Sequence, residues 1–205
     1  MKGTGWLFGV VLLAAAAAAA QDESRPVPVI PWASSRKLTV GDFKGKVPAS
    51  ASNGSISQVS IQVSSLCEEG IAHFDVQAIF DPNLSWWRDP LPNLWRDLDA
   101  PFAASADRGS SLLAHEQLHF DLTELWARRM SAALEALGPV CGTPAAEASV
   151  NKTVADIEKR WREEQQRYDR QTNNGLDARQ QKAWQIRTAT ALASHQLPAA
   201  TPAAR

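Results

Sequence analysis

The segment LLAHEQLHFDL, residues 112–122, places two histidines four residues apart, with a glutamate directly after the first. Residues i and i+4 of an α-helix lie on one face, so a helix would point His115 and His119 at a single ion. Zinc suits this pair because it binds imidazole and accepts tetrahedral geometry. Glu116 would lie about 100° further around the helix, beside the ion, where it can accept a proton from a water that the metal activates. The segment therefore predicts a helix that carries two zinc ligands, His115 and His119, and a catalytic base, Glu116.

A helix that carries exposed histidines without a metal is the alternative, because the bare His-Glu-x-x-His pattern occurs by chance in unrelated helices. Two features favour the metal. The pentad contains two of the four histidines of the chain, and leucines flank it on both sides, which would keep the site partly dry.

The sequence predicts one long helix around the pentad and two shorter helices after it. Asp107 or Ser110 can cap the long helix, and Gly138-Pro139 can end it. Apolar residues recur at helical spacing between these limits: Leu112, Leu118, Leu122, Leu125, Trp126, Met130, Leu134 and Leu137. The second helix is expected from about residue 146 to 167, before the breaking stretch TNNG, and its other face is charged and solvated. Its apolar residues are Val150, Val154, Ile157, Trp161 and Tyr168. Asp177 is expected to cap a third helix that ends near residue 194.

Two segments before the long helix alternate between apolar and polar residues. They are SISQVSIQVSSL and IAHFDVQAIF, with Ile71, Phe74, Val76 and Ile79 as the apolar residues of the second. The intervening CEEG has turn chemistry, so the pair predicts an antiparallel hairpin. A proline-rich N-terminal arm with a short strand near Lys37–Val40 precedes it. The segment DPNLSWWRDPLPNLWRDLDAPF is rich in tryptophan and proline, which indicates a loop that either lines a cleft or covers a core. The expected fold class is α+β.

Residues 1–20 have the composition of a signal peptide: Lys2, the apolar run WLFGVVLL, and an alanine-rich end before Gln21. No later segment is expected to span a membrane. We therefore expect export to the periplasm or the medium, one domain over residues 21–197, and a disordered tail at 198–205. The formal net charge of −1 gives no basic face for nucleic acid.

The chain has two cysteines, Cys67 and Cys141. In an oxidising compartment such a pair most simply forms one disulfide, and two free buried thiols are the alternative.

The stretches HEQLHFDLTELWARRM and RYDRQTNNGLDARQQKAW together resemble a bacterial family of predicted secreted zinc-dependent proteases, otherwise described as a domain of unknown function. In that family a His-Glu-x-x-His helix precedes a Tyr-Asp-x-x-Thr-x-His-Gly motif. WASSRKLTVGDFKG, IFDPNLSWW and a cysteine on each side of the helix extend the resemblance over most of the mature chain. It implies a zincin-like fold, in which a small antiparallel sheet precedes the active-site helix and two further helices, and a zinc-dependent peptidase that acts on peptides or proteins.

The second motif maps onto Tyr168, Asp169, Thr172 and Gly175, but Asn174 stands where the family has histidine. An amide oxygen is a poor zinc ligand, so we expect Asp169 to be the third ligand, with Asn174 and His195 as further candidates. Asp169 could instead support a ligand histidine as a hydrogen-bond acceptor.

Tyr168 is expected either to donate a hydrogen bond to the developing oxyanion or to serve as a core aromatic with a satisfied hydroxyl. Two other functions stay open. One is a non-catalytic relative of these proteases, which Asn174 favours, and the other is a periplasmic binding or scaffold protein.

Overall fold

The structure is a computed structural model that describes residues 26–51, 54–88, 105–138 and 141–194. The expected signal peptide, the C-terminal tail, His195 and most of the tryptophan-rich segment lie outside these residues. No helix within the described residues is long and apolar enough to cross a membrane. The architecture is α+β, as the sequence predicts, and the described residues form three α-helices and two small antiparallel sheets, where one sheet was expected.

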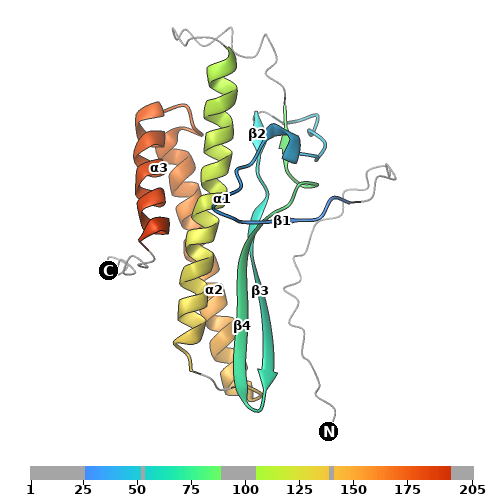
Figure 1. Ribbon diagram of the computed structural model, residues 1–205, viewed down its shortest axis with the longest axis vertical. Helices are drawn as coiled ribbons and strands as arrows, with labels where there is room; N and C mark the ends of the chain where they lie inside the picture. The colour runs from blue at the N-terminus through green and yellow to red at the C-terminus, as the bar shows by residue number, and fades with distance from the viewer. Residues whose placement is uncertain (1–25, 52–53, 89–104, 139–140, 195–205) are drawn as a thin grey trace.

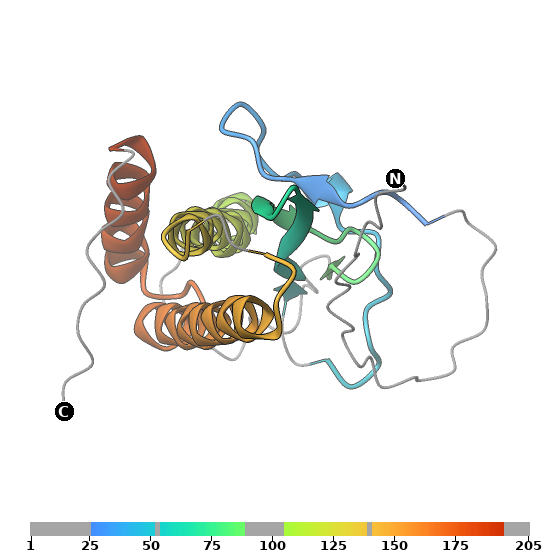
Figure 2. The same ribbon diagram turned by 90° about the horizontal axis from the view of Figure 1, so that it is seen from below.

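Helix α1 (Ser105–Glu135) forms the centre of the molecule (Figure 1). The strands lie along one side of it, and α2 (Pro144–Thr172) and α3 (Ala178–Ala193) lie along the other, as the view from below also shows (Figure 2). Helix α1 begins before both predicted caps, Asp107 and Ser110, which are therefore residues of the helix. Because neighbours cover α1 on both sides, its buried residues belong to three separate clusters rather than one stripe.

The predicted hairpin is formed by β3 (Val59–Glu68) and β4 (Ile71–Phe80), paired in register from Val59↔Phe80 to Glu68↔Ile71. A two-residue turn joins them at Glu69-Gly70, where both residues have positive φ, as such turns require. The face of β4 that packs toward α1 carries the even-numbered residues Phe74, Val76, Ala78 and Phe80. Ile71 is 45% exposed, and Ile79 lies on the opposite face, so these two do not share the core face with Phe74 as the predicted pattern implied.

The short strand predicted at Lys37–Val40 is wrong. Val40–Asp42 forms a 3₁₀ turn, η1, because the Asp42 carboxylate accepts hydrogen bonds from the backbone N–H of Thr39 (2.7 Å) and from its hydroxyl (3.0 Å). The strand of the arm is β1 (Ile30–Pro31), which pairs with the end of β4. Proline fits there because β1 lies at the edge of its sheet.

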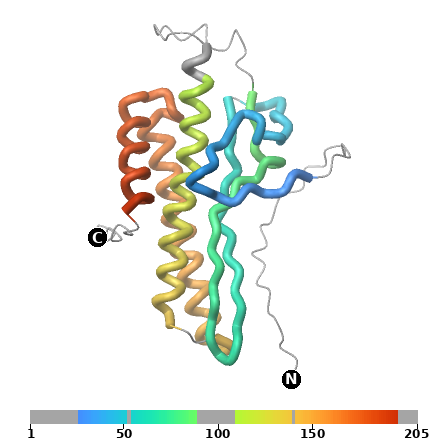
Figure 3. The backbone as a smooth tube through the Cα atoms, in the orientation of Figure 1, coloured from blue at the N-terminus to red at the C-terminus, as the bar shows by residue number. Residues whose placement is uncertain are grey.

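The N-terminal arm crosses the strands and reaches α1 (Figure 3), where it contacts Gln117 of the pentad. Trp32 Nε1 donates to Asp121 Oδ1 (2.8 Å), and the backbone N–H of Leu38 donates to Gln117 Oε1 (2.7 Å). A second sheet pairs β2 (Ser55–Ile56) with β5 (Trp86–Trp87). Together the arm and β2 attach residues far apart in sequence to the N-terminal half of α1.

Helix α2 is longer than predicted. Thr143 caps its start by accepting from the backbone N–H of Ala146 (3.2 Å), and Asn173 ends it in a left-handed conformation. Tyr168 and Asp169 therefore lie in its last turns rather than beyond its end. Helix α3 is capped by Asp177, as predicted.

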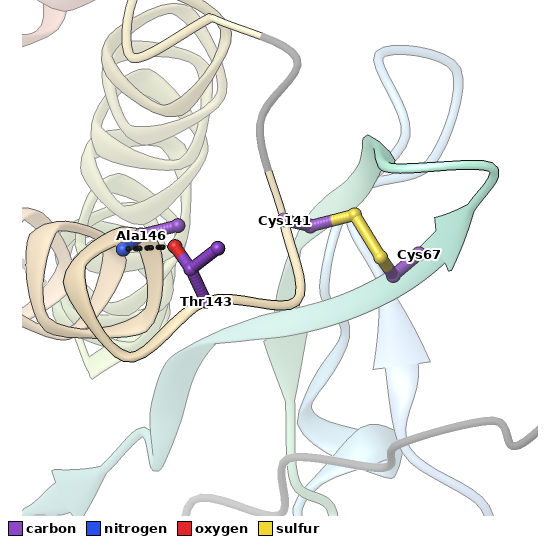
Figure 4. The surroundings of a disulfide bond; sticks show 4 residues. All are labelled: Cys67, Cys141, Thr143 and Ala146. Carbon is purple, nitrogen blue, oxygen red and sulfur yellow. Dashed lines mark hydrogen bonds between the residues drawn. A yellow bond between two sulfur atoms is a disulfide. The ribbon is translucent and has the colours of Figure 1, made fainter.

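A disulfide between Cys67 and Cys141 confirms the expected pairing (Figure 4). It joins the turn end of the β3–β4 hairpin to the segment just before α2, with a sequence separation of 74.

Candidate metal centre

Three side-chain atoms converge where α1 passes the last turns of α2. The Nε2 atoms of His115 and His119 are 3.2 Å apart, as the i, i+4 spacing predicts. Asp169 Oδ1 lies 3.3 Å from the first and 2.9 Å from the second. His115 is buried and His119 is nearly so, but the Asp169 side chain is 37% exposed. This cluster of three ligand atoms is therefore exposed to solvent on the Asp169 side.

The spacing of these atoms fits a zinc ion. Zinc–ligand distances of about 2.0–2.2 Å place tetrahedral ligand atoms about 3.3–3.6 Å apart. The observed separations of 2.9–3.3 Å are slightly shorter, so small movements of the side chains would admit the ion. Two histidines and one carboxylate are also a ligand set found in catalytic zinc sites, where a fourth position stays open. This is the one group of at least three histidine, cysteine or acidic side chains with metal-site spacing among the described residues.

The electrostatics of this cluster of three ligand residues favour a cation. Burial alone would raise the pKa of Asp169, but hydrogen bonds from His115 and His119 outweigh it and hold this pKa well below its usual range. Burial alone would lower the pKa of His119, but the hydrogen bond to Asp169 and the negative charges of Glu116 and Asp169 raise it above its ordinary value. A positive charge between these groups, whether a proton or a metal, is therefore stabilised.

The turn after α2 holds His115 in place. Asn173, Asn174 and Gly175 all have positive φ, and a Cβ added at Gly175 would lie 3.0 Å from both Cβ and Cγ of His115. A larger residue here would have to displace the His115 side chain and would be strained by the positive φ, so the position favours glycine. The Thr172 hydroxyl donates to the carbonyl of Tyr168 (2.8 Å) and accepts from the backbone N–H of Gly175 (3.2 Å), which closes the turn.

Tyr168 lies behind His115 and is fully buried. Its ring stacks on that of His115, and its hydroxyl donates to Gln181 Oε1 (2.8 Å) and lies 3.2 Å from the carbonyl oxygen of His115. Burial raises the pKa of Tyr168 far above its ordinary value, so the phenol stays neutral. This geometry matches the core aromatic with a satisfied hydroxyl and places the hydroxyl away from solvent.

Glu116 is buried and held by the segment that begins with β2. Its Oε1 accepts from the Ser55 hydroxyl (2.6 Å), and its Oε2 accepts from the backbone N–H of Ser57 (3.1 Å) and from the Ser57 hydroxyl. Three donors that satisfy both oxygens keep the carboxylate in one orientation.

Two other residues near the motifs, Asn174 and Glu124, have contacts of their own among the described residues. Asn174 is exposed in the turn, and its backbone N–H donates to the carbonyl of Asp169 (2.9 Å). His195 lies outside the described residues. Glu124, which follows His119 by five residues, pairs with Arg128 (2.8 Å) on α1.

Four residues of this site were not anticipated from sequence: Ser55, Ser57, Gln165 and Gln181. The two glutamines accept from the Nδ1 atoms of the histidines, Gln165 from His119 (2.6 Å) and Gln181 from His115 (3.3 Å). Gln165 had a usable signal, since it precedes Asp169 by four residues and so shares its helix face. That signal was lost because α2 was expected to end near residue 167. The serines and Gln181 come from other elements, and no local pattern marks them.

The model of a bacterial protein family of unknown function (DUF922) matches residues 90–175 of this chain. The matched range contains His115, Glu116, His119, Tyr168 and Asp169, and it ends at Gly175. Its description assigns no activity. No curated protein and no solved structure matches the chain.

Proposed function

We propose that this protein is an exported zinc-dependent peptidase in which His115, His119 and Asp169 hold the metal. The observation that best supports this is the convergence of three ligand atoms, the first of which comes from the residue directly before a buried glutamate, Glu116, on the same helix. A zinc ion held there would supply Lewis acidity, which polarises a carbonyl group and lowers the pKa of a water molecule.

The protein's own groups would do the rest of the chemistry. Glu116 would take a proton from the attacking water and return it to the leaving amine, as a general base and then a general acid. Ser55 and Ser57 would keep its carboxylate in place between these steps. Tyr168 would hold His115 rather than contact the substrate. A peptide or protein substrate would approach from the side of Asp169, whose side chain is partly exposed.

Export is part of the same proposal. The disulfide is typical of proteins that mature in an oxidising compartment, and the first twenty residues have the composition of a signal peptide.

A zinc-binding protein without peptidase activity is the second candidate. Both oxygens of Glu116 already accept hydrogen bonds in a buried position, and Asn174 replaces the histidine of the motif. In such a protein the metal would stabilise the junction of α1 and α2 without taking part in a reaction.

The test begins with metal analysis of the purified mature protein and with hydrolysis of a mixed peptide library. The peptidase requires about one zinc per chain and cleavage that a chelator stops and added zinc restores. The double variant His115→Ala/His119→Ala should hold no zinc, and metal retained by that variant would refute the site.

Glu116→Gln then separates catalysis from binding. The amide can still exchange hydrogen bonds with both serines, because hydroxyl groups donate and accept. It should bind zinc and fail to cleave. Full cleavage by this variant would exclude Glu116 as the base, and zinc binding by the parent without any cleavage would favour the second candidate.

A further inference from the structure

The side chain of Gln165 lies between α1 and α2 in an environment that leaves its amide one orientation. Its Nε2 donates to the carbonyl oxygen of His119 (3.0 Å) and to the hydroxyl oxygen of Thr123 (3.0 Å). Reversing the amide would place its oxygen against that carbonyl oxygen, with no hydrogen between them. Oε1 must therefore face His119 Nδ1, at 2.6 Å.

The surrounding bonds hold the two acceptors in place. Thr123 donates its hydroxyl hydrogen to the His119 carbonyl (2.8 Å), so its oxygen can only accept from Gln165 and from Trp161 Nε1 (3.2 Å). Every donor and acceptor in this group is thus accounted for. An oxygen fixed opposite Nδ1 requires that this nitrogen carry the hydrogen, and a neutral imidazole then has its lone pair on Nε2.

Gln181 does not constrain His115 in the same way. Its Oε1 lies 3.3 Å from His115 Nδ1, and its Nε2 has no hydrogen-bond partner among the described residues. The other contact of its Oε1 is the Tyr168 hydroxyl (2.8 Å), which can equally accept from an amide nitrogen and donate to the His115 carbonyl, so it does not fix which end of the amide faces the ring. Of the two glutamines, Gln165 is the one whose orientation the structure determines.

We infer that Gln165 is a positioning residue of the metal centre, which keeps a hydrogen on Nδ1 of His119 and so leaves Nε2, beside His115 and Asp169, as the nitrogen that can bind a metal. The inference about metal affinity rests on the proposed zinc site, whereas the hydrogen on Nδ1 does not depend on a metal. Metal-ligating histidines generally donate their second N–H to an oxygen acceptor, which fixes the ring and increases the basicity of the ligating nitrogen.

The variant Gln165→Met removes the acceptor and both donors at nearly constant volume. Gln165→Glu keeps an acceptor oxygen for His119 Nδ1 but removes the donors to His119 and Thr123, so it separates the acceptor from the rest of the network. The matched control is Gln171→Met, which lies on the same helix and loses one hydrogen bond from Trp184 Nε1 (3.0 Å). Thermal unfolding of all four proteins identifies any variant whose fold is lost.

Two measurements read out the effect. Long-range ¹H–¹⁵N correlation of the histidine side chains, assigned with His119→Ala, reports the Nδ1–H of His119 in metal-free and zinc-supplemented protein at one fixed pH. Competition with a chromogenic chelator gives the zinc dissociation constant. The parent and Gln171→Met should show a protected Nδ1–H with and without zinc. Gln165→Met should lose it and bind zinc about 10- to 100-fold more weakly, and Gln165→Glu should lie closer to the parent on both readouts.

Each outcome decides a different point. A protected Nδ1–H and parental zinc affinity in Gln165→Met would overturn the inference, and so would a Gln165→Glu variant that behaves like Gln165→Met. If the parent binds no zinc yet loses the Nδ1–H resonance in Gln165→Met, the positioning role stands and the proposed peptidase fails. If the parent binds zinc and the resonance is insensitive to position 165, the zinc site stands and the positioning role fails.

Discussion

The rings of His115 and Tyr168 are stacked, with centroids 4.6 Å apart and planes inclined by 24°. The same tyrosine meets the ring of His119 edge-on at 4.8 Å. One side chain from the motif on α2 therefore contacts both histidines of the motif on α1. This relationship connects the two motifs physically and gives Tyr168 a role in holding the imidazoles.

Replacing Tyr168 with phenylalanine should therefore affect stability more than chemistry. The ring contacts survive, but the bond to Gln181 Oε1 is lost in a buried position, so the free energy of unfolding should fall by about 1–3 kcal/mol. Zinc content should stay at the parental value, and kcat should fall much less than in Glu116→Gln. Urea unfolding and peptide hydrolysis measure both effects. If the variant kept the stability of the parent but lost all activity, the Tyr168 hydroxyl would instead have to act on the carbonyl group of the substrate.

The hydrogen bonds that Ser55 and Ser57 donate to Glu116, here called the serine clamp, give a second prediction. Ser57→Ala removes a hydroxyl donor from a buried carboxylate, and bonds to charged groups contribute about 1.5–3 kcal/mol. The free energy of unfolding should fall by that amount. Zinc content should be unchanged, but kcat should fall because the carboxylate loses its fixed orientation. Ser64→Ala, at an exposed position of β3, is the control and should match the parent. Equal behaviour of the two variants in urea unfolding and hydrolysis would argue against the clamp.

The spacing of the pentad was sufficient to predict that His115 and His119 share a helix face, because that relationship depends on one helix alone. Asp169 was identified through the resemblance of the second motif to the protease family, and the structure brings it beside both histidines. Ser55 and Gln181 reach the site only through the packing of β2 and α3 on α1, which no local periodicity encodes.

The errors have a common cause. The strand expected at Lys37–Val40 was inferred from local composition, but the side chain of Asp42 closes a turn there. Helix α2 was ended too early, although Tyr168 continues its buried stripe. In both cases a residue just past the predicted boundary decides the local structure: Asp42 through its carboxylate, and Asn173 through its left-handed backbone.

The disulfide should stabilise the fold without supporting the metal centre. It closes a loop with a sequence separation of 74 residues, and removing such a bond costs about 3–5 kcal/mol in the chain-entropy model. Cys67→Ser/Cys141→Ser should unfold at lower urea concentration by that amount. Its zinc affinity, once it is folded, should equal that of the parent, because the bond joins elements at the other end of α1 (Figures 1 and 4). Titration of two free thiols in the denatured, unreduced parent would show that the bond does not form.

The metal-free protein should be most stable in mildly acidic solution. The pKa of Asp169 is lowered from its ordinary 3.8, so its contribution is present above that value and is lost as the pH falls through the folded-state pKa. The pKa of His119 is raised from 6.5, so its contribution is present below 6.5 and is lost as the pH rises through the folded-state pKa. Both contributions coexist between about pH 4 and 6.5.

Chelator-treated protein should therefore lose stability from pH 6 to pH 8, measured by urea unfolding at each pH. Asp169→Asn is the control, because it removes the charge that raises the pKa of His119, and its stability should change less over this interval. If the free energy of unfolding had the same dependence on pH in the two proteins, the effect could not be assigned to the interaction between His119 and Asp169.

The third ligand is the most consequential prediction. Asp169 Oδ1 lies 2.9 Å from His119 Nε2 and is, among the residues that the structure describes, the one carboxylate oxygen grouped with both histidines, whereas Asn174 is exposed in the turn. Asp169→Ala should therefore weaken zinc binding much more than Asn174→Gly, which accepts the positive φ of that position without strain. Asn174→His should tighten zinc binding or change activity, since it restores the imidazole of the motif. Chelator competition on the three variants measures the order. If Asp169→Ala kept the zinc affinity of the parent and Asn174→Gly lost it, the third ligand would be the Asn174 amide or a water that it holds. If neither variant lost zinc affinity, His195 would be the next candidate for the third ligand.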